Sequence, residues 1–68
     1  MKKVVVSYEV IDDKDRWMGG YSIKLDRPDT TALEMAIYNA NQSRGTVYAI
    51  DENGDREEVY NHLKRNAR

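Results

Sequence analysis

The lack of cysteine is the feature that most constrains how this short chain can fold. Its 68 residues contain no cysteine and one histidine, His62, which excludes disulfides and zinc sites built from cysteines or several histidines. A chain of this length buries a modest fraction of its surface, so its core provides a margin of only a few kcal/mol. We therefore expect a single domain over residues 1–68 that depends on a lean core or on association with another copy.

The charge pattern argues against a strong nucleic-acid binder. Charged residues make up 34% of the chain, and acidic and basic residues are mixed to a formal net charge of −1. No apolar run approaches the ~20 residues that span a membrane. The first residues, Met1-Lys2-Lys3 and a short valine run, lack the apolar core of a signal peptide. We expect a cytoplasmic protein that does not contact a membrane.

Alternation of apolar and polar residues predicts two strands in the first part of the chain. Segment 3–11 has valine and tyrosine at every second position, which is typical of a half-buried strand. A polar turn at 12–16 follows, and the glycine pair at 19–20 permits a bulge or a positive φ where a second strand begins. That strand is predicted over 21–25. Because the connection is short, the two strands should form an antiparallel hairpin.

A capping box predicts the start of one helix. Thr31 precedes Glu34 by three residues, so the two side chains can satisfy N–H groups at the helix start. Residues 32–43 are rich in helix formers, and Gly45 stands where a helix-ending glycine is expected. Residues 46–50 are apolar and β-branched, which predicts a third strand. The helical residues expected to face the sheet are Leu33, Ala36, Ile37 and Ala40.

The segment after the third strand fits more than one structure. The Asn-Gly pair at 53–54 favours a type I′ hairpin turn, which would return the chain as a fourth strand. A short helix over 56–66 is the alternative, with basic residues at its C-terminal end. Fraying of 61–68 is a third interpretation. The predicted fold class is α+β: a small antiparallel sheet of three to four strands with one helix packed on one face, in the order β-β-α-β, then β or a short helix.

The residues that are able to carry chemistry fit structural roles better. The acidic loops at 12–15 and 51–55 lack the glycine of a calcium-binding loop, and we interpret them as solvated turns. The glycine pair at 19–20 precedes no helix and no Lys-Ser or Lys-Thr pair, unlike a phosphate-binding loop. His62 has no identifiable nucleophile partner. We predict no catalytic residue, no metal and no cofactor, and therefore no enzyme.

Exposed aromatic and charged positions predict a protein-binding surface. Trp17 stands at the far end of the first hairpin, and Val5 and Ile11 fall on the outward parity of the first strand, which a solvated face does not require. Residues 51–58 carry five acidic groups and one arginine, a net −4, which can steer a partner. A small open sheet also leaves edges that recruit strands. The predicted anchors are Trp17, Met18, Tyr21, Tyr48 and Tyr60, and the predicted charged rim is Asp51, Glu52 and Asp55.

The layout resembles that of many short phage-encoded proteins, among them small inhibitors of host RNA polymerase. The resemblance is carried by Tyr21-Ser22-Ile23-Lys24-Leu25 running into Thr30-Thr31-Ala32-Leu33-Glu34-Met35-Ala36. It implies a non-enzymatic modulator that binds a host protein in the cytoplasm of a bacterial cell.

The expected function is therefore that of a small protein–protein interaction module whose partner is another protein or a second copy. The alternative is a nucleic-acid-binding accessory protein, in which sheet tyrosines stack on bases and the basic C-terminal tail contacts phosphates.

Overall fold

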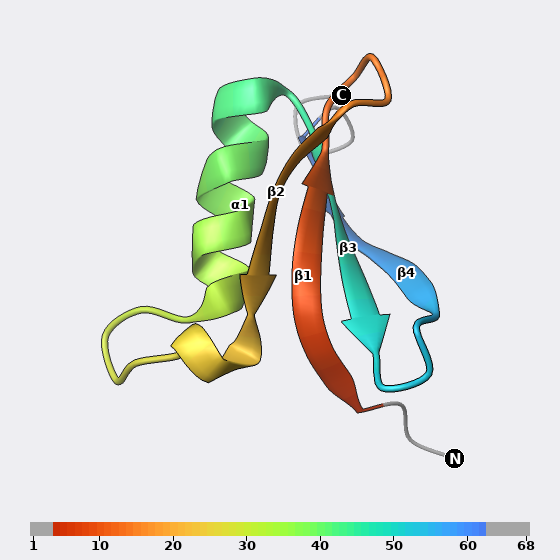
Figure 1. Ribbon diagram of the computed structural model, residues 1–68. Helices are drawn as coiled ribbons and strands as arrows, with labels where there is room; N and C mark the ends of the chain where they lie inside the picture. The colour runs from red at the N-terminus through yellow and green to blue at the C-terminus, as the bar shows by residue number, and fades with distance from the viewer. Residues whose placement is uncertain (1–3, 63–68) are drawn as a thin grey trace.

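The computed structural model describes residues 4–62 and confirms the predicted α+β class. Within that range, four strands form one antiparallel sheet in the order β2-β1-β3-β4, and one α-helix packs on it (Figure 1). The strands are β1 (Val5–Ile11), β2 (Trp17–Ser22), β3 (Thr46–Asp51) and β4 (Arg56–Asn61), and the helices are the 3₁₀ helix η1 (Ile23–Leu25) and α1 (Ala32–Ser43).

The segment after β3 is a strand, so the alternative of a short helix beginning at residue 56 is wrong. β4 pairs with β3 along its whole length, from Thr46 opposite Asn61 to Ile50 opposite Arg56. Backbone pairing with a neighbouring strand outweighs the weak local preference for a helix. The fraying expected over 61–68 concerns residues 63–68 for the most part, and these lie outside the described residues.

The second strand ends earlier than predicted. β2 stops at Ser22, and the expected continuation to Leu25 is wrong because residues 23–25 form η1. The hydroxyl oxygen of Ser22 accepts a hydrogen bond from the backbone N–H of Lys24 at 3.2 Å. A serine that bonds a nearby N–H offers the backbone an alternative to the strand ladder. This local bond turns the chain toward α1.

In each hairpin loop, an aspartate side chain accepts hydrogen bonds from backbone N–H groups of the same loop. Asp12 and Asp51 are buried, and Oδ1 of each accepts the N–H groups two and four residues later at 2.8 to 3.0 Å. In each loop the fourth residue has a positive φ, 65° at Asp15 and 86° at Gly54. This geometry is typical of a type I turn followed by a bulge. The predicted type I′ turn at 53–54 is wrong, because Asn53 keeps a negative φ.

The core is small because alanines form the buried face of α1. Ala32, Ala36 and Ala40 are fully buried, as are Val10 of β1 and Val47 of β3. Half-buried side chains pack around this centre, and they are Tyr8, Tyr21, Leu33, Ile37 and Tyr60. The predicted inward face of the helix is therefore confirmed, with Ala32 in addition.

A bulge changes which side chains of β1 face the helix. The register between β1 and β3 shifts between Val5 and Ser7, so Val5 lies opposite the buried Asp51. Val6 is exposed at the bulge. The prediction that Val5 falls on the outward side of the strand is therefore wrong, because the extra residue reverses the alternation.

Gly45 is required for a reason other than the predicted one. The left-handed position that ends α1 is held by Arg44, with φ 59° and ψ 43°. The N–H groups of Arg44 and Gly45 both donate to the carbonyl oxygen of Ala40. A Cβ atom on Gly45 would lie 2.7 Å from the carbonyl oxygen of Ile11 and 3.0 Å from Cγ1 of Val10. A glycine therefore permits the close approach to β1.

We expect opposite effects from substitutions at these two neighbours. Arg44→Gly should raise the free energy of unfolding by about 1 kcal/mol, because a left-handed conformation is strained for any residue with a Cβ. Gly45→Ala should lower it by about 2 kcal/mol, because β1 must move to admit the methyl group. Urea unfolding followed by circular dichroism measures both. A Gly45→Ala variant as stable as the wild type would contradict the close approach.

The first hairpin should be sensitive to acid through Asp12. The hydrogen bond from the backbone N–H of Arg16 is the largest cause that holds the pKa of Asp12 below its ordinary value. Burial opposes this by raising the pKa, and the Arg16 guanidinium, with Nε 2.8 Å from Oδ2, lowers it again. A carboxylate with a lowered pKa stabilises the fold above its unfolded pKa of about 3.9, and this stabilisation is lost as pH falls through the folded pKa.

We therefore expect the free energy of unfolding to fall below about pH 4, and to fall less steeply in an Asp12→Asn variant. Urea unfolding between about pH 6 and about pH 2 measures the two slopes. Asp29→Asn serves as the control, because Asp29 is exposed and lies outside both turns. Equal slopes for the wild type and Asp12→Asn would show that Asp12 does not carry the effect.

Candidate protein-binding surface

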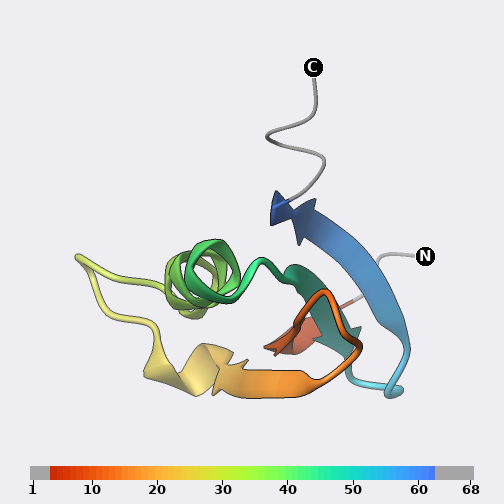
Figure 2. The same cartoon turned by 90° about the horizontal axis from the view of Figure 1, so that it is seen from above.

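The cross-strand register assigns each side chain to one of the two sheet faces, since directly opposite residues share a face. Val10, Val47 and Tyr60 are opposite one another and lie on the face that α1 covers. Figure 2 shows α1 on this one side of the sheet. No element within residues 4–62 covers the other side, which we call the open face. The register places on it Ser7, Glu9, Ile11, Trp17, Gly20, Ser22, Thr46, Tyr48, Ile50, Arg56, Glu58 and Asn61.

An ion pair occupies the middle of the open face. Nη1 of Arg56 donates to Oε1 of Glu9 at 2.5 Å, and this hydrogen bond raises the pKa of Arg56. The Arg56 guanidinium also lies 5.5 Å from the centre of the Tyr48 ring, within cation–π range. A shallow hollow of about 470 Å³ adjoins them, with Ile11 and Asp15 in its wall. The predicted anchor Tyr48 is thus partly covered by a cation of its own chain.

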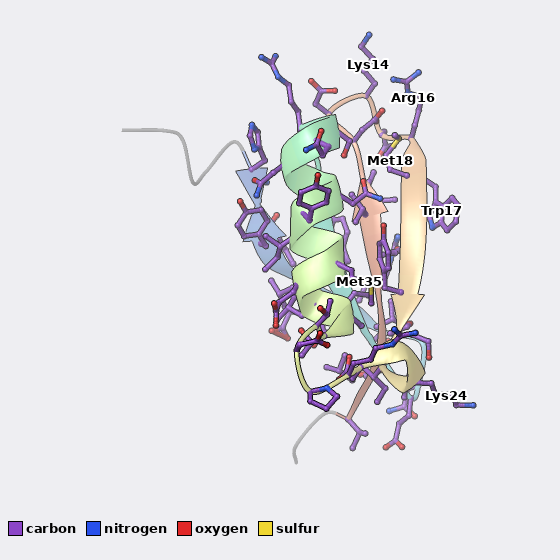
Figure 3. All side chains as sticks on the ribbon, turned by 90° about the vertical axis from the view of Figure 1, so that its left-hand side faces the viewer. Lys14, Arg16, Trp17, Met18, Lys24 and Met35 are labelled. Atoms are coloured by element: carbon purple, nitrogen blue, oxygen red, sulfur yellow. The ribbon has the colours of Figure 1, made fainter. Side chains whose placement is uncertain are left out.

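Trp17 is the most prominent side chain of the open face. It is 64% exposed and lies opposite Ile11 at the start of β2. A Cβ atom on Gly20 would come within 3.3 Å of Cζ2 of the indole, so the ring lies over this glycine. Figure 3 shows Trp17 pointing from β2 away from the helix. The structure therefore places Trp17 at the surface, on an edge strand that begins four residues before the predicted strand over 21–25.

Apolar side chains also gather on the helix side of β2. Tyr21, Met35 and Tyr38 line a hollow of about 500 Å³, with Thr30 and Glu34 at its other walls. Tyr38 is 68% exposed, and Met18 of β2 is 41% exposed. We call Trp17, Met18, Tyr21, Met35 and Tyr38 the β2-edge surface.

Asn39 fixes the helix side of this surface. Its Nδ2 group donates to the hydroxyl oxygen of Tyr21 at 2.7 Å and lies 3.3 Å from the carbonyl oxygen of Met18. The amide thus links α1 to β2 and holds the Tyr21 ring between them. Sequence reasoning did not select Asn39, Met35 or Tyr38. The signal it left unused is an apolar pair three residues apart on the outer side of the predicted helix.

The remaining predicted residues lie elsewhere. Tyr60 belongs to the covered face, packs against the core, and donates its hydroxyl hydrogen to Oδ1 of Asn41 at 2.5 Å. Asp51 is buried in its turn, whereas Glu52 and Asp55 are exposed there. Figure 1 shows that this turn and the β1–β2 turn, which precedes Trp17, are at opposite ends of the sheet. The structure therefore keeps Trp17, Met18 and Tyr21 on one edge strand, with Trp17 on the open face and Tyr21 on the helix-covered face, and separates the acidic rim from them.

The one histidine of the chain, His62, contacts a side chain of the helix. Nδ1 of His62 lies 3.1 Å from Oδ1 of Asn41, the same oxygen that Tyr60 contacts. Among residues 4–62, no three histidine, cysteine, aspartate or glutamate side chains are grouped to hold a metal ion. No helix in this described part of the chain is long and apolar enough to cross a membrane.

Comparison with known proteins assigns no relative. The chain matches no protein-family model, and no curated protein or solved structure matches it. The functional argument therefore depends on the geometry of the chain itself.

We expect Trp17 and Tyr60 to differ in their contribution to stability. Trp17→Ala should lower the free energy of unfolding by less than about 1 kcal/mol, because most of the ring is in solvent. Tyr60→Ala should lower it by about 2 kcal/mol, because that ring packs against the core. Thermal and urea unfolding measure both variants. A loss at Trp17 as large as that at Tyr60 would assign Trp17 to the core and remove it as an anchor.

Proposed function

We propose that this chain is a small non-enzymatic protein–protein interaction module that binds its partner at the β2-edge surface. The observation that carries the proposal is the exposure of Trp17, at 64%, on a strand at the edge of the sheet. Tryptophan and tyrosine dominate the energetics of protein interfaces, and exposed edge strands bind extended segments by strand addition. A shallow hollow beside Tyr21, lined mainly by apolar atoms, lies next to the same strand.

The distribution of tyrosines favours a protein over a nucleic acid as the partner. Tyr8, Tyr21 and Tyr60 lie on the helix-covered face, and Tyr48 of the open face is under Arg56. Base stacking on a sheet needs aromatic rings in a row on an open face. The formal net charge of −1 also gives little attraction for phosphates.

The partner that we propose is a protein in the cytoplasm, either another protein or a second copy of this chain. A chain without cysteine suits a reducing compartment. If the chain is phage-encoded, as its layout suggests, the partner is a host protein that it inhibits or modulates. This extension rests on the resemblance of the segments at 21–25 and 30–36 to short phage-encoded proteins.

Capture experiments with matched variants test the proposal. Tagged wild type, Trp17→Ala and Val59→Ala are exposed to lysate of the source cells, and the retained proteins are quantified by mass spectrometry. We expect Trp17→Ala to lose at least about tenfold of a specifically retained protein, which corresponds to a contribution of about 1.4 kcal/mol. Val59→Ala, a change at an exposed residue of the opposite edge, should retain it. Equal retention by all three would refute a binding role for Trp17.

A further inference from the structure

The two edges of the sheet differ in charge. β2 carries no charged residue from Trp17 to Ser22, whereas β4 begins with Arg56, Glu57 and Glu58. Charged side chains on an edge strand discourage the addition of another strand. In the described part of the chain, β4 has this protection and β2 lacks it.

Two other features of the edge strands are closely matched. Each edge strand contains one bulge residue, Met18 in β2 and Val59 in β4. The two residues are similarly exposed, at 41% and 44%. The bulges and the exposure of apolar side chains therefore do not distinguish the edges, and the charge does.

A second copy of this chain fits the β2 edge without electrostatic conflict. Two identical edge strands that meet about a two-fold axis perpendicular to the sheet run antiparallel. Like charges directly opposite each other destabilise such a pair, and two copies of β2 bring none together. Two copies of β4 would bring Glu57 and Glu58 of both chains onto one short pair of strands. The same axis keeps both α1 helices on one side of the joined sheet, where Met35 and Tyr38 of each copy flank the junction.

The exposed aromatic side chains supply part of the area that a dimer requires. Trp17 and Tyr38 are 64% and 68% exposed, so together they offer roughly 300 Å² of aromatic surface. A stable interface buries about 800 Å² per partner. Met18, Met35 and the backbone of β2 supply further area. Among the described residues of one copy, the largest fully buried side chains are Val10 and Val47. Because this core is small, apolar area buried between two copies would add materially to the stability of the fold.

We infer that β2 pairs with β2 of a second copy to form one continuous antiparallel sheet with four strands from each copy. This inference rests on the proposed function, because it takes the β2-edge surface as the binding site and names its partner.

Solution mass across a concentration series tests the inference, with variants at the two matched bulge residues. The wild type should approach twice the chain mass of 7.9 kDa, measured by light scattering behind a sizing column. Met18→Lys should raise the dissociation constant of the dimer at least about tenfold, because it puts a lysine on the pairing edge. Val59→Lys should leave the constant unchanged. Hydrogen exchange should show concentration-dependent protection of β2 amides and none of β4 amides.

Each contrary result has a distinct meaning. A wild-type mass of 7.9 kDa up to about 1 mM would overturn the inference, while Trp17-dependent capture of another protein would leave the proposed function standing. A dimer broken by Val59→Lys and not by Met18→Lys would place the contact at β4 and overturn it as well. Circular dichroism checks that each variant folds. If Met18→Lys does not fold, the hydrogen-exchange pattern of the wild type decides between β2 and β4.

Discussion

The close contact between an alanine face of α1 and the sheet is the interaction on which the rest of the molecule depends. Ala32, Ala36 and Ala40 recur every four residues, so they form one row along the helix, and all three are fully buried. Small side chains let the helix lie near Val10 of β1, but they remove little apolar area from water. The larger apolar groups must therefore sit around this centre, half-buried or exposed. The surface aromatics follow from the small core.

The sheet order follows from two hairpins with the same turn. Each turn is closed by a buried aspartate, Asp12 or Asp51, whose carboxylate replaces water as the acceptor for two loop N–H groups. The first arm of each hairpin, β1 or β3, pairs with the first arm of the other. The second arms, β2 and β4, are left as edges. The two edges are thus equivalent in sheet topology, but α1 packs against β2, and the side chains of the two edge strands differ.

Local signals were sufficient to predict most of the fold. The Thr31 hydroxyl accepts the Glu34 N–H at 3.2 Å, as the capping box predicted, because both groups lie within one helical turn. The glycine pair at 19–20 indicated a bulge at the start of β2, where the extra residue is Met18. The bulges at Val6 and Val59 were not predictable, since a register shift depends on the neighbouring strand. The clash that makes Gly45 necessary also comes from a distant strand.

The candidate surface was predictable only where local sequence patterns indicate it. Trp17 and Met18 were selected because an aromatic and a methionine beside glycines form a local pattern. Tyr38 was not selected, because its exposure depends on which helix face remains after α1 packs on the sheet. The sequence analysis grouped the acidic rim with the anchors, although the rim and Trp17 lie at opposite ends of the sheet. Only the paired strands show that distance (Figure 1).

The glycine pair in β2 gives Trp17 a property that exposure alone does not. A Cβ atom on Gly19 would lie 3.1 Å from Nδ2 of Asn39, and one on Gly20 would lie 3.3 Å from the Trp17 ring. The space above and below the strand at these glycines is therefore already occupied by side chains. Glycines weaken an isolated strand, yet here they let the indole lie against the backbone. A ring held in this way loses less conformational freedom on binding, so more of its burial contributes to affinity.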